Sequence, residues 1–189
     1  MEPSTNEEKQ EMQNKPYREF IGGLIYLANA TRPDIAYAAA LLSRFTSNPG
    51  KAHWDCAKRV LRYLNTTSSY KIEYNKDDEK LIAYSDSDWA ADIDDRRSCT
   101  GNLLILAGGP VSWKSKKQSS VSLSTMEAEY VALSEICREV MFMIRLMDCM
   151  DYVETPVTVF CDNQTAIELS KNAMYHKRSK HIGISFHYT

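Results

Sequence analysis

The sequence predicts an α/β fold with a mixed sheet, preceded by a small helical segment. Three observations support this prediction. Residues 17–67 carry apolar side chains at helical spacing and are interrupted twice by turn-forming residues. From residue 70 onward, short apolar runs typical of strands take over. A long helical pattern over residues 124–150 then separates two of these runs, and such a connection crosses over right-handed and leaves its two strands parallel.

Residues 17–67 are predicted to form three helices. The first carries Phe20, Leu24 and Leu27 on its apolar face, and its Gly22-Gly23 pair marks either a weak point or a close-packing point. The apolar stripe of the third helix consists of Trp54, Ala57, Val60, Leu61 and Leu64. Residues 1–16 are polar and acidic, and we expect them to form a disordered lead-in.

The second part of the chain carries the strand patterns. Before the long helix, they cover residues 70–74, 81–89, 101–109 and 110–118, with a hairpin turn at Gly108-Gly109. A short apolar strand over residues 157–162 follows the long helix, and a short helix comes after it. We expect an antiparallel meander that the last strand joins parallel to the strand over residues 81–89.

Composition narrows the function classes. The 189 residues carry a formal net charge of −2, so any basic surface for nucleic acid must be local. The five cysteines include no C-x-x-C pair and are interpreted as reduced thiols of an intracellular protein, cytoplasmic or nuclear. No apolar run reaches the length of a membrane span, and the N-terminus does not resemble a secretory signal. We therefore expect no membrane partner.

Two strand patterns end in acids. The run LIAYS is followed by Asp86, and the run VTVFC by Asp162. If these strands are parallel neighbours, about 4.8 Å apart, both carboxylates lie at the carboxyl edge of the sheet, where ligand sites of α/β folds gather. Two such anions repel each other unless a cation neutralises them, and Mg²⁺ prefers carboxylate oxygens. The alternative for Asp162 is an N-cap of the helix that follows.

The long helix offers Glu127 and Glu129 as a third ligand. The helical stripe that must face the sheet consists of Met126, Tyr130, Leu133, Cys137, Val140 and Ile144. At about 100° per residue, Glu129 lies at the edge of this stripe, whereas Glu127 points away and is expected to be solvated or to interact with the helix dipole. Glu129 is therefore the better candidate, with an ordinary surface glutamate as the alternative.

A basic stretch precedes the long helix. Lys114, Lys116 and Lys117 follow Trp113, and this combination suits contacts with phosphate and sugar. Hydrogen-bonding side chains at Asn163 and Gln164 suit contacts with the backbone or 2′-hydroxyl groups of a nucleic acid. The alternative is a hairpin edge whose charges prevent aggregation.

These residues lie in stretches that closely resemble the ribonuclease H region of copia-type retrotransposon Pol polyproteins. The matching stretches are YSDSDWAADIDDRRSCTG, VSWKSKKQSSVSLSTMEAEYVALSE, VFCDNQTAIELSKN and HKRSKHI. Residues 17–67 resemble the thumb-like segment that ends the reverse transcriptase of these polyproteins, and residues 70–189 resemble the ribonuclease H-like domain. The resemblance therefore covers nearly the whole chain from Tyr17 onward.

The resemblance implies cleavage of the RNA strand of an RNA–DNA hybrid with two Mg²⁺ ions, for which Mn²⁺ can substitute. Asp86, Glu129 and Asp162 match the first three of four family carboxylates, and Asp88 is a nearby acid whose alternative is a structural role. The fourth carboxylate lies on a last helix after a fifth strand, and the sequence stops before both. We therefore expect a C-terminally truncated fold, and the alternative function is an inactive fragment that binds nucleic acid or protein, including other parts of a Pol polyprotein.

The stretch from Arg59 to Arg62 spells R-x-L-R, a pattern of some secreted pathogen effectors. It falls within a predicted helix and no signal peptide accompanies it, so we interpret the match as coincidental.

Overall fold

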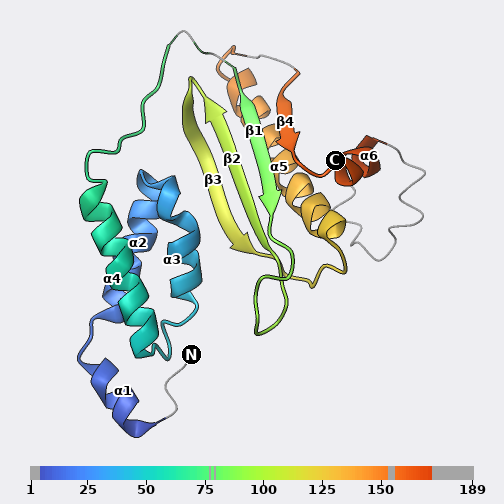
Figure 1. Ribbon diagram of the computed structural model, residues 1–189. Coiled ribbons are helices and arrows are strands. Elements are labelled where there is room, and N and C mark those ends of the chain that lie inside the picture. Colours follow the sequence, from blue (N-terminus) through green and yellow to red (C-terminus); the bar gives the residue numbers. More distant parts are fainter. Residues whose placement is uncertain (1–4, 77, 79, 153–155, 172–189) are drawn as a thin grey trace. The chain divides into compact units, whose positions relative to one another are not determined.

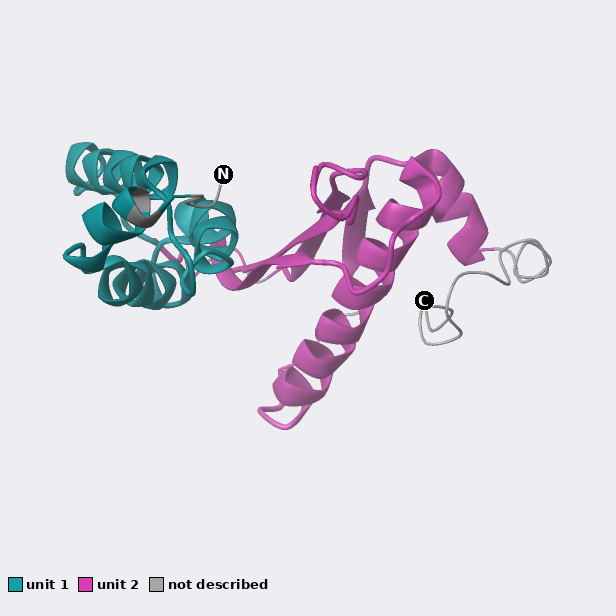
Figure 2. Cartoon of the chain, turned by 90° about the horizontal axis from the view of Figure 1, so that it is seen from below, with its two compact units in different colours: residues 1–72 teal, residues 73–189 magenta. Residues whose placement is uncertain are grey.

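The computed structural model describes residues 5–76, 78, 80–152 and 156–171. The chain divides into two compact units, residues 1–72 and residues 73–189, drawn in two colours in Figure 2. The stretch HKRSKHI and the rest of residues 172–189 lie outside the described residues. None of the helices in the described part of the chain is long and apolar enough to cross a bilayer.

The first unit is helical. Its elements are α1 (Asn6–Gln13), α2 (Tyr17–Ala30), the 3-10 turn η1 (Pro33–Ile35), α3 (Ala36–Ser43) and α4 (Lys51–Thr66). The three helices expected from the pattern are thus present as α2, α3 and α4. The buried face of α2 consists of Tyr17, Ile21, Leu24 and Ala28, so it is rotated from the predicted one and Leu27 is partly exposed.

The expectation of a disordered lead-in is wrong for residues 6–13, which form α1. Met12 is only 6% exposed and packs into the core of the first unit. Glu11 also lies 3.4 Å from Lys51 of α4 in an exposed ion pair. One apolar side chain thus anchors a stretch whose composition is otherwise polar.

The second unit is a four-stranded mixed sheet with two helices (Figure 1). Its elements are β1 (Ile82–Ser87), β2 (Cys99–Leu106), β3 (Gly109–Lys117), α5 (Thr125–Asp148), β4 (Thr158–Cys161) and α6 (Gln164–Lys171). The strand order is β3-β2-β1-β4, with β1 antiparallel to β2 and parallel to β4. The predicted α/β fold with a ribonuclease H-like mixed sheet is therefore confirmed.

Residues 70–74 do not form the predicted strand. The segment that follows Ile72 instead runs beside the β2–β3 hairpin through single contacts. The hydroxyl of Tyr74 donates to the Pro110 carbonyl at 2.9 Å, and the Asn75 N–H donates to the Ala107 carbonyl at 2.6 Å. This segment thus contacts the hairpin through isolated hydrogen bonds and not through a strand ladder.

Helix α5 covers one face of the sheet and sets the position of the candidate site. Its apolar side chains pack against those of the strands in one core cluster, whose buried members are Leu81, Ala83, Leu104, Leu133, Ile136, Val140 and Met147. Helix α6 attaches to α5 through Ala166 and Leu169, which pack against the fully buried Tyr130. The first turns of α5 are thereby fixed beside the carboxyl ends of β1 and β4.

Candidate metal centre

The two strand-end acids meet as neighbours at the carboxyl edge of the sheet. In the parallel pairing of β1 with β4, Ser85 lies opposite Cys161, and the next residues along the two strands are Asp86 and Asp162. Both acids are exposed, as expected for side chains at an open sheet edge. The crossover through α5 therefore produces the strand arrangement on which the predicted site depends.

Glu129 reaches this edge from the second turn of α5. It is 6% exposed, and its Oε1 accepts a hydrogen bond of 3.0 Å from the Ser87 backbone N–H. Its Oε2 is buried and has no hydrogen-bond partner among the described residues. A buried carboxylate oxygen without a partner loses its hydration without compensation, which is unfavourable for the charged form of the side chain.

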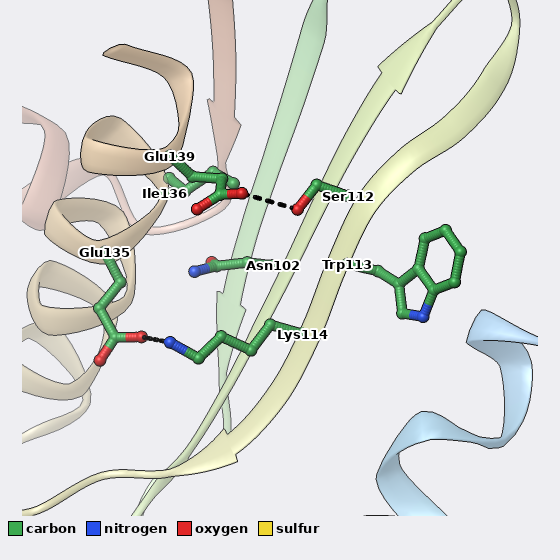
Figure 3. A pocket seen from close by; sticks show the side chains of 7 residues that line it. All are labelled: Asn102, Ser112, Trp113, Lys114, Glu135, Ile136 and Glu139. Atoms are coloured by element: carbon green, nitrogen blue, oxygen red, sulfur yellow. Dashed lines mark hydrogen bonds and ion pairs between the residues drawn. The ribbon is translucent and has the colours of Figure 1, made fainter. Parts of the chain in front are cut away.

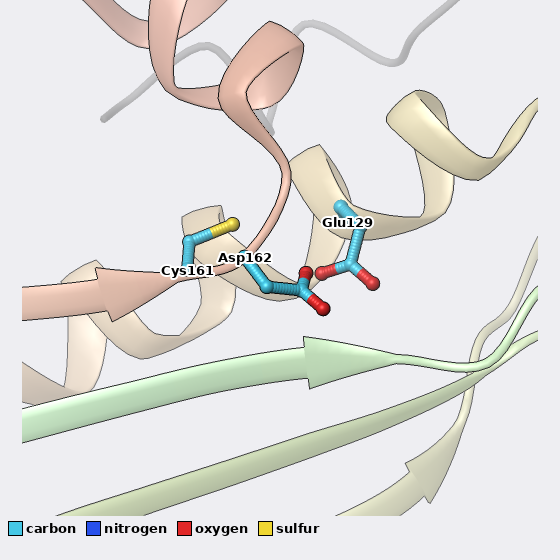
Figure 4. A group of neighbouring side chains, drawn as sticks. All are labelled: Glu129, Cys161 and Asp162. Atoms are coloured by element: carbon cyan, nitrogen blue, oxygen red, sulfur yellow. The ribbon is translucent and has the colours of Figure 1, made fainter.

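Glu129 and Asp162 form a cluster with the thiol of Cys161 (Figure 4). One oxygen of each carboxylate and the Cys161 Sγ all lie within 4.8 Å of one another. In Figure 4, the carboxyl groups of Glu129 and Asp162 point toward the same space between α5 and the strands. Asp86 is not a member of this cluster, although its charge acts on it.

Electrostatics at the cluster favour a cation. Burial raises the pKa of Glu129, and the negative charges of Asp162 and Asp86 raise it further, against the opposing effect of the Ser87 N–H. Burial also raises the pKa of the Cys161 thiol, and the same three acids add to this shift. A divalent cation removes the repulsion that causes these shifts, so the donor set fits such an ion.

Asp162 does not cap helix α6. The Ala166 N–H donates a 3.0 Å hydrogen bond to the Oδ1 of Asn163, which therefore occupies the capping role. The N-cap alternative for Asp162 is wrong, because the helix begins one residue later than that alternative requires.

Glu127 and Asp88 have structural partners. The Oε2 of Glu127 accepts from the Leu123 N–H at 2.7 Å, and Glu127 is only 6% exposed, so it is not solvated. It lies in the first turn of α5, as the alternative of an interaction with the helix dipole requires. The Ser124 hydroxyl accepts from the Glu127 N–H, and together these bonds hold the first turn of α5. The Oδ1 of Asp88 accepts from the Cys99 N–H at 2.6 Å and so ties β1 to β2.

The structure does not gather the three candidate lysines into one free basic patch. Lys114 forms a 3.0 Å ion pair with Glu135 of α5, beside a shallow pocket that Asn102, Ser112 and Glu139 also line (Figure 3). Lys117 pairs instead with Asp92 and Asp95 of the β1–β2 loop. Lys116 is exposed and forms no ion pair within the described ranges.

The other two candidate nucleic-acid contacts lie near the metal cluster. Asn163 is half-buried and uses its carbonyl oxygen as the cap of α6, which leaves its amide N–H groups as donors. Gln164 is exposed in the first turn of α6. They are the two residues that follow Asp162, so they lie at the same end of β4 as that acid.

Sequence reasoning missed Cys161. Its signal was available, because side chains alternate along a strand and Cys161 directly precedes the candidate ligand Asp162. Phe160 is 50% exposed on one face, and Cys161 is consequently turned to the face that α5 covers. A thiol on this face at the end of β4 must come close to Glu129.

In comparisons with known proteins, the chain is similar to Pol polyproteins from plant transposons. The chain is 45% identical over 186 residues to the "Retrovirus-related Pol polyprotein from transposon TNT 1-94" of Nicotiana tabacum. The aligned residues make up 98% of this chain and 14% of that protein. It is 41% identical over 174 residues to the corresponding polyprotein from transposon RE1 of Arabidopsis thaliana, which is 91% of this chain and 12% of that protein. The chain therefore spans about a seventh or less of the length of these polyproteins.

A shorter relative is "Secreted RxLR effector protein 161" of Plasmopara viticola, at 49% identity over 133 residues, 70% of this chain and 94% of that protein. The interpretation that residues 59–62 match the R-x-L-R pattern by coincidence stays a prediction. No family model matches the chain, and no solved structure matches it. The identity to the transposon polyproteins extends over both units, and the chain belongs to the copia-type family of retrovirus-related Pol polyproteins from transposons.

Proposed function

We propose that the second unit is the ribonuclease H-like part of a copia-type Pol polyprotein, which binds an RNA–DNA hybrid and hydrolyses its RNA strand. Mg²⁺ is the proposed cofactor, as two ions, with Mn²⁺ as a substitute. One observation carries this proposal: Glu129 and Asp162 converge at the carboxyl edge of the sheet, and one oxygen of Glu129 is buried there without a partner. The partners on this proposal are the hybrid and other parts of the same polyprotein.

The residues of the site have distinct roles in this proposal. Glu129 and Asp162, with the nearby charge of Asp86, would hold the divalent ions, which would supply an activated water and charge stabilisation for the leaving oxygen of an in-line displacement. The Ser87 N–H holds the Oε1 of Glu129, and the second oxygen has no partner among the described residues, so in this proposal it binds the cation. Asp162 is exposed and holds the solvent side, where a phosphate can approach. Asp86 adds negative charge from β1.

Contacts with the hybrid are proposed for Lys116, the amide of Asn163 and Gln164, with lesser roles for Lys114 and Lys117. Lys116 and Gln164 are exposed and Asn163 is half-buried, and phosphate and 2′-hydroxyl oxygens carry most recognition of such a duplex. Lys114 and Lys117 must first separate from acids of the same unit. Their contribution to hybrid binding is therefore smaller than their charge suggests.

Hybrid cleavage tests the proposal. The chain is incubated with an end-labelled RNA–DNA hybrid and Mg²⁺ or Mn²⁺, and we expect metal-dependent RNA products. Asp162→Asn and Glu129→Gln should each lower the rate by about 100-fold or more, since even an outer-shell partner of a metal costs about 10- to 100-fold. Asp88→Asn is the matched control, because its side chain bonds the Cys99 N–H and asparagine keeps that acceptor.

Two results would contradict the proposal that the second unit is a nuclease. One is the absence of metal-dependent products, and the other is equal cleavage by the Asp162→Asn variant. A specific observation favours the alternative of binding without cutting: Asp86 lies outside the 4.8 Å cluster, so only two carboxylates of the described residues converge closely. A gel-mobility shift of the hybrid, with no RNA cleavage products in the presence of Mg²⁺ or Mn²⁺, supports that alternative.

A further inference from the structure

We propose that Cys161 makes this centre a mixed thiol–carboxylate site that takes Zn²⁺ in competition with Mg²⁺. The inference rests on the metal centre of the proposed function, but it concerns a different ion and a ligand of different chemistry. Its observable consequence is a Zn²⁺-bound state in which Cys161, Glu129 and Asp162 share one ion.

The thiol is placed by the sheet. Cys161 is the last residue of β4 and is half-buried on the face that α5 covers, where it also packs near Tyr130. Its Sγ lies within 4.8 Å of carboxylate oxygens of both Glu129 and Asp162. Its one hydrogen bond is a 4.0 Å contact with the Asn163 carbonyl, which is long and does not hold the thiol away from the acids.

The surroundings are built for a ligand. Glu129 is only 6% exposed, its carboxyl group points into the same space (Figure 4), and its buried Oε2 has no hydrogen-bond partner among the described residues. The hydroxyl of Ser85, which lies opposite Cys161 in the pairing of β1 with β4, is also buried without a hydrogen-bond partner within the described residues. A bound cation with its water would satisfy polar atoms that the protein leaves unsatisfied.

The donor set discriminates between metals. Mg²⁺ takes oxygen ligands and retains several waters, so it gains nothing from the thiol. Zn²⁺ binds thiolate sulfur at about 2.3 Å and carboxylate oxygen at about 2.1 Å in a tetrahedron, which places neighbouring ligand atoms about 3.6 Å apart. The three ligand atoms lie within 4.8 Å of one another, so small side-chain rotations bring them to this spacing, and the exposed side chain of Asp162 has the most freedom to move. The fourth position of the tetrahedron is left to water.

The binding step involves no redox change. The Cys161 sulfur forms its bond to Zn²⁺ as the S–H bond breaks, and the proton leaves to the buffer. Because the same ion engages Glu129 and Asp162, Zn²⁺ removes these ligands from Mg²⁺. Micromolar Zn²⁺ is therefore expected to act as a competitor at this centre.

Peptide-resolved alkylation tests the inference without any nucleic acid. The full chain is treated with iodoacetamide with and without Zn²⁺, and labelling of each cysteine is followed by mass spectrometry. We expect Zn²⁺ to slow labelling of Cys161 by about ten-fold or more. The exposed Cys149, at the end of α5, is the internal control and should label at the same rate in both samples.

Variants and a second readout complete the test. Glu129→Gln and Asp162→Asn should each abolish the Zn²⁺ protection of Cys161. In a Cd²⁺ titration, the ultraviolet thiolate–metal band should be lost in Cys161→Ser and kept in Cys149→Ser. Equal labelling of Cys161 with and without Zn²⁺ overturns the inference, as does an unchanged Cd²⁺ band in Cys161→Ser. Hybrid cleavage with Mg²⁺ alone is measured separately. If the chain does not cleave the hybrid, the Zn²⁺-binding results can still be interpreted, and if Zn²⁺ does not bind, the cleavage result can still be interpreted.

Discussion

The environment of Glu129 in the second unit is unfavourable for the charged form of its carboxyl group. It is buried, one of its oxygens lacks a partner among the described residues, and two other acids act on it. Because these effects raise its pKa, the folded protein favours the protonated form. The resulting stabilisation is fully present below the pKa of an unfolded glutamate, about 4.3, and is lost as the pH rises through the folded pKa.

We predict that Glu129→Gln stabilises the metal-free protein at neutral pH. Glutamine can still accept the Ser87 N–H bond, and it carries no charge to repel the neighbouring acids. The melting temperature at pH 7 should rise by a few degrees, and the difference should vanish near pH 4, where the wild-type carboxyl is protonated. Calorimetry in a chelating buffer at both pH values measures the effect.

The exposed Glu168 of α6 supplies the control, since Glu168→Gln should leave the pH 7 melting temperature unchanged. Addition of Mg²⁺ should then stabilise the wild type and not the Glu129→Gln variant. Identical melting of wild type and Glu129→Gln at pH 7 would show that the carboxyl group is not destabilising.

Helical periodicity was sufficient to place Glu129 at the sheet, and its bond to Ser87 confirms that placement. Its role as a metal ligand stays a prediction. Periodicity failed for Glu127, because the loop before α5 folds back and offers the Leu123 N–H to a side chain that the helix alone would leave in water. Contacts made by irregular backbone of this kind leave no repeating pattern in a sequence.

Among the elements, the β2–β3 hairpin depends on a close approach at Gly109. A Cβ atom at this position would lie 2.6 Å from the Glu73 carbonyl oxygen and 2.7 Å from the ring of Tyr74. The neighbouring segment passes so close to the hairpin that only glycine fits. This contact also replaces the strand that the alternating pattern of residues 70–74 predicted.

We therefore predict that Gly109→Ala destabilises the second unit by about 1–3 kcal/mol, the usual cost of overpacking. Gly101→Ala in β2 is the matched control, because its Cβ would meet only the Asp86 carbonyl oxygen at 3.8 Å, an ordinary contact. Urea unfolding followed by circular dichroism compares the two variants. A loss for Gly101→Ala as large as that for Gly109→Ala would contradict the steric explanation.

The elements of the second unit from β1 onward were largely predictable. Period-two runs and the long helical stripe fixed the strands, the hairpin and the parallel strand after α5. Two elements were not predictable from patterns. Helix α1 depends on Met12 finding a core elsewhere in the first unit, and the tyrosines of residues 70–74 have a strand-like spacing but other partners. Both outcomes depend on tertiary contacts and not on local spacing.

At the scale of the whole molecule, charge limits how the chain can bind nucleic acid. The net charge of −2 gives no general attraction to phosphate, and Lys114 and Lys117 are already paired with acids. Of the three lysines before α5, only Lys116 is therefore without an ion pair within the described residues. Hybrid binding by this chain should depend only weakly on salt.

We predict a slope of about −1 to −2 for the logarithm of the hybrid association constant against the logarithm of salt concentration. Fluorescence anisotropy with a labelled hybrid between about 50 and 200 mM salt measures it. Lys116→Ala should reduce the size of the slope by about 1, whereas Lys58→Ala, which removes an exposed lysine paired with Asp55 in α4, should not. A slope of about −5, or an unchanged slope in Lys116→Ala, would contradict this account.

The parallel pairing of β1 with β4 has a kinetic consequence. The acids come from three distant points of the chain, so the proposed cation site cannot form until α5 has formed and β4 has docked beside β1. Pairings between remote segments form late, because the intervening chain must first be closed into a loop. During synthesis or refolding, uptake of a divalent ion would therefore mark the moment at which the last strand of the sheet arrives.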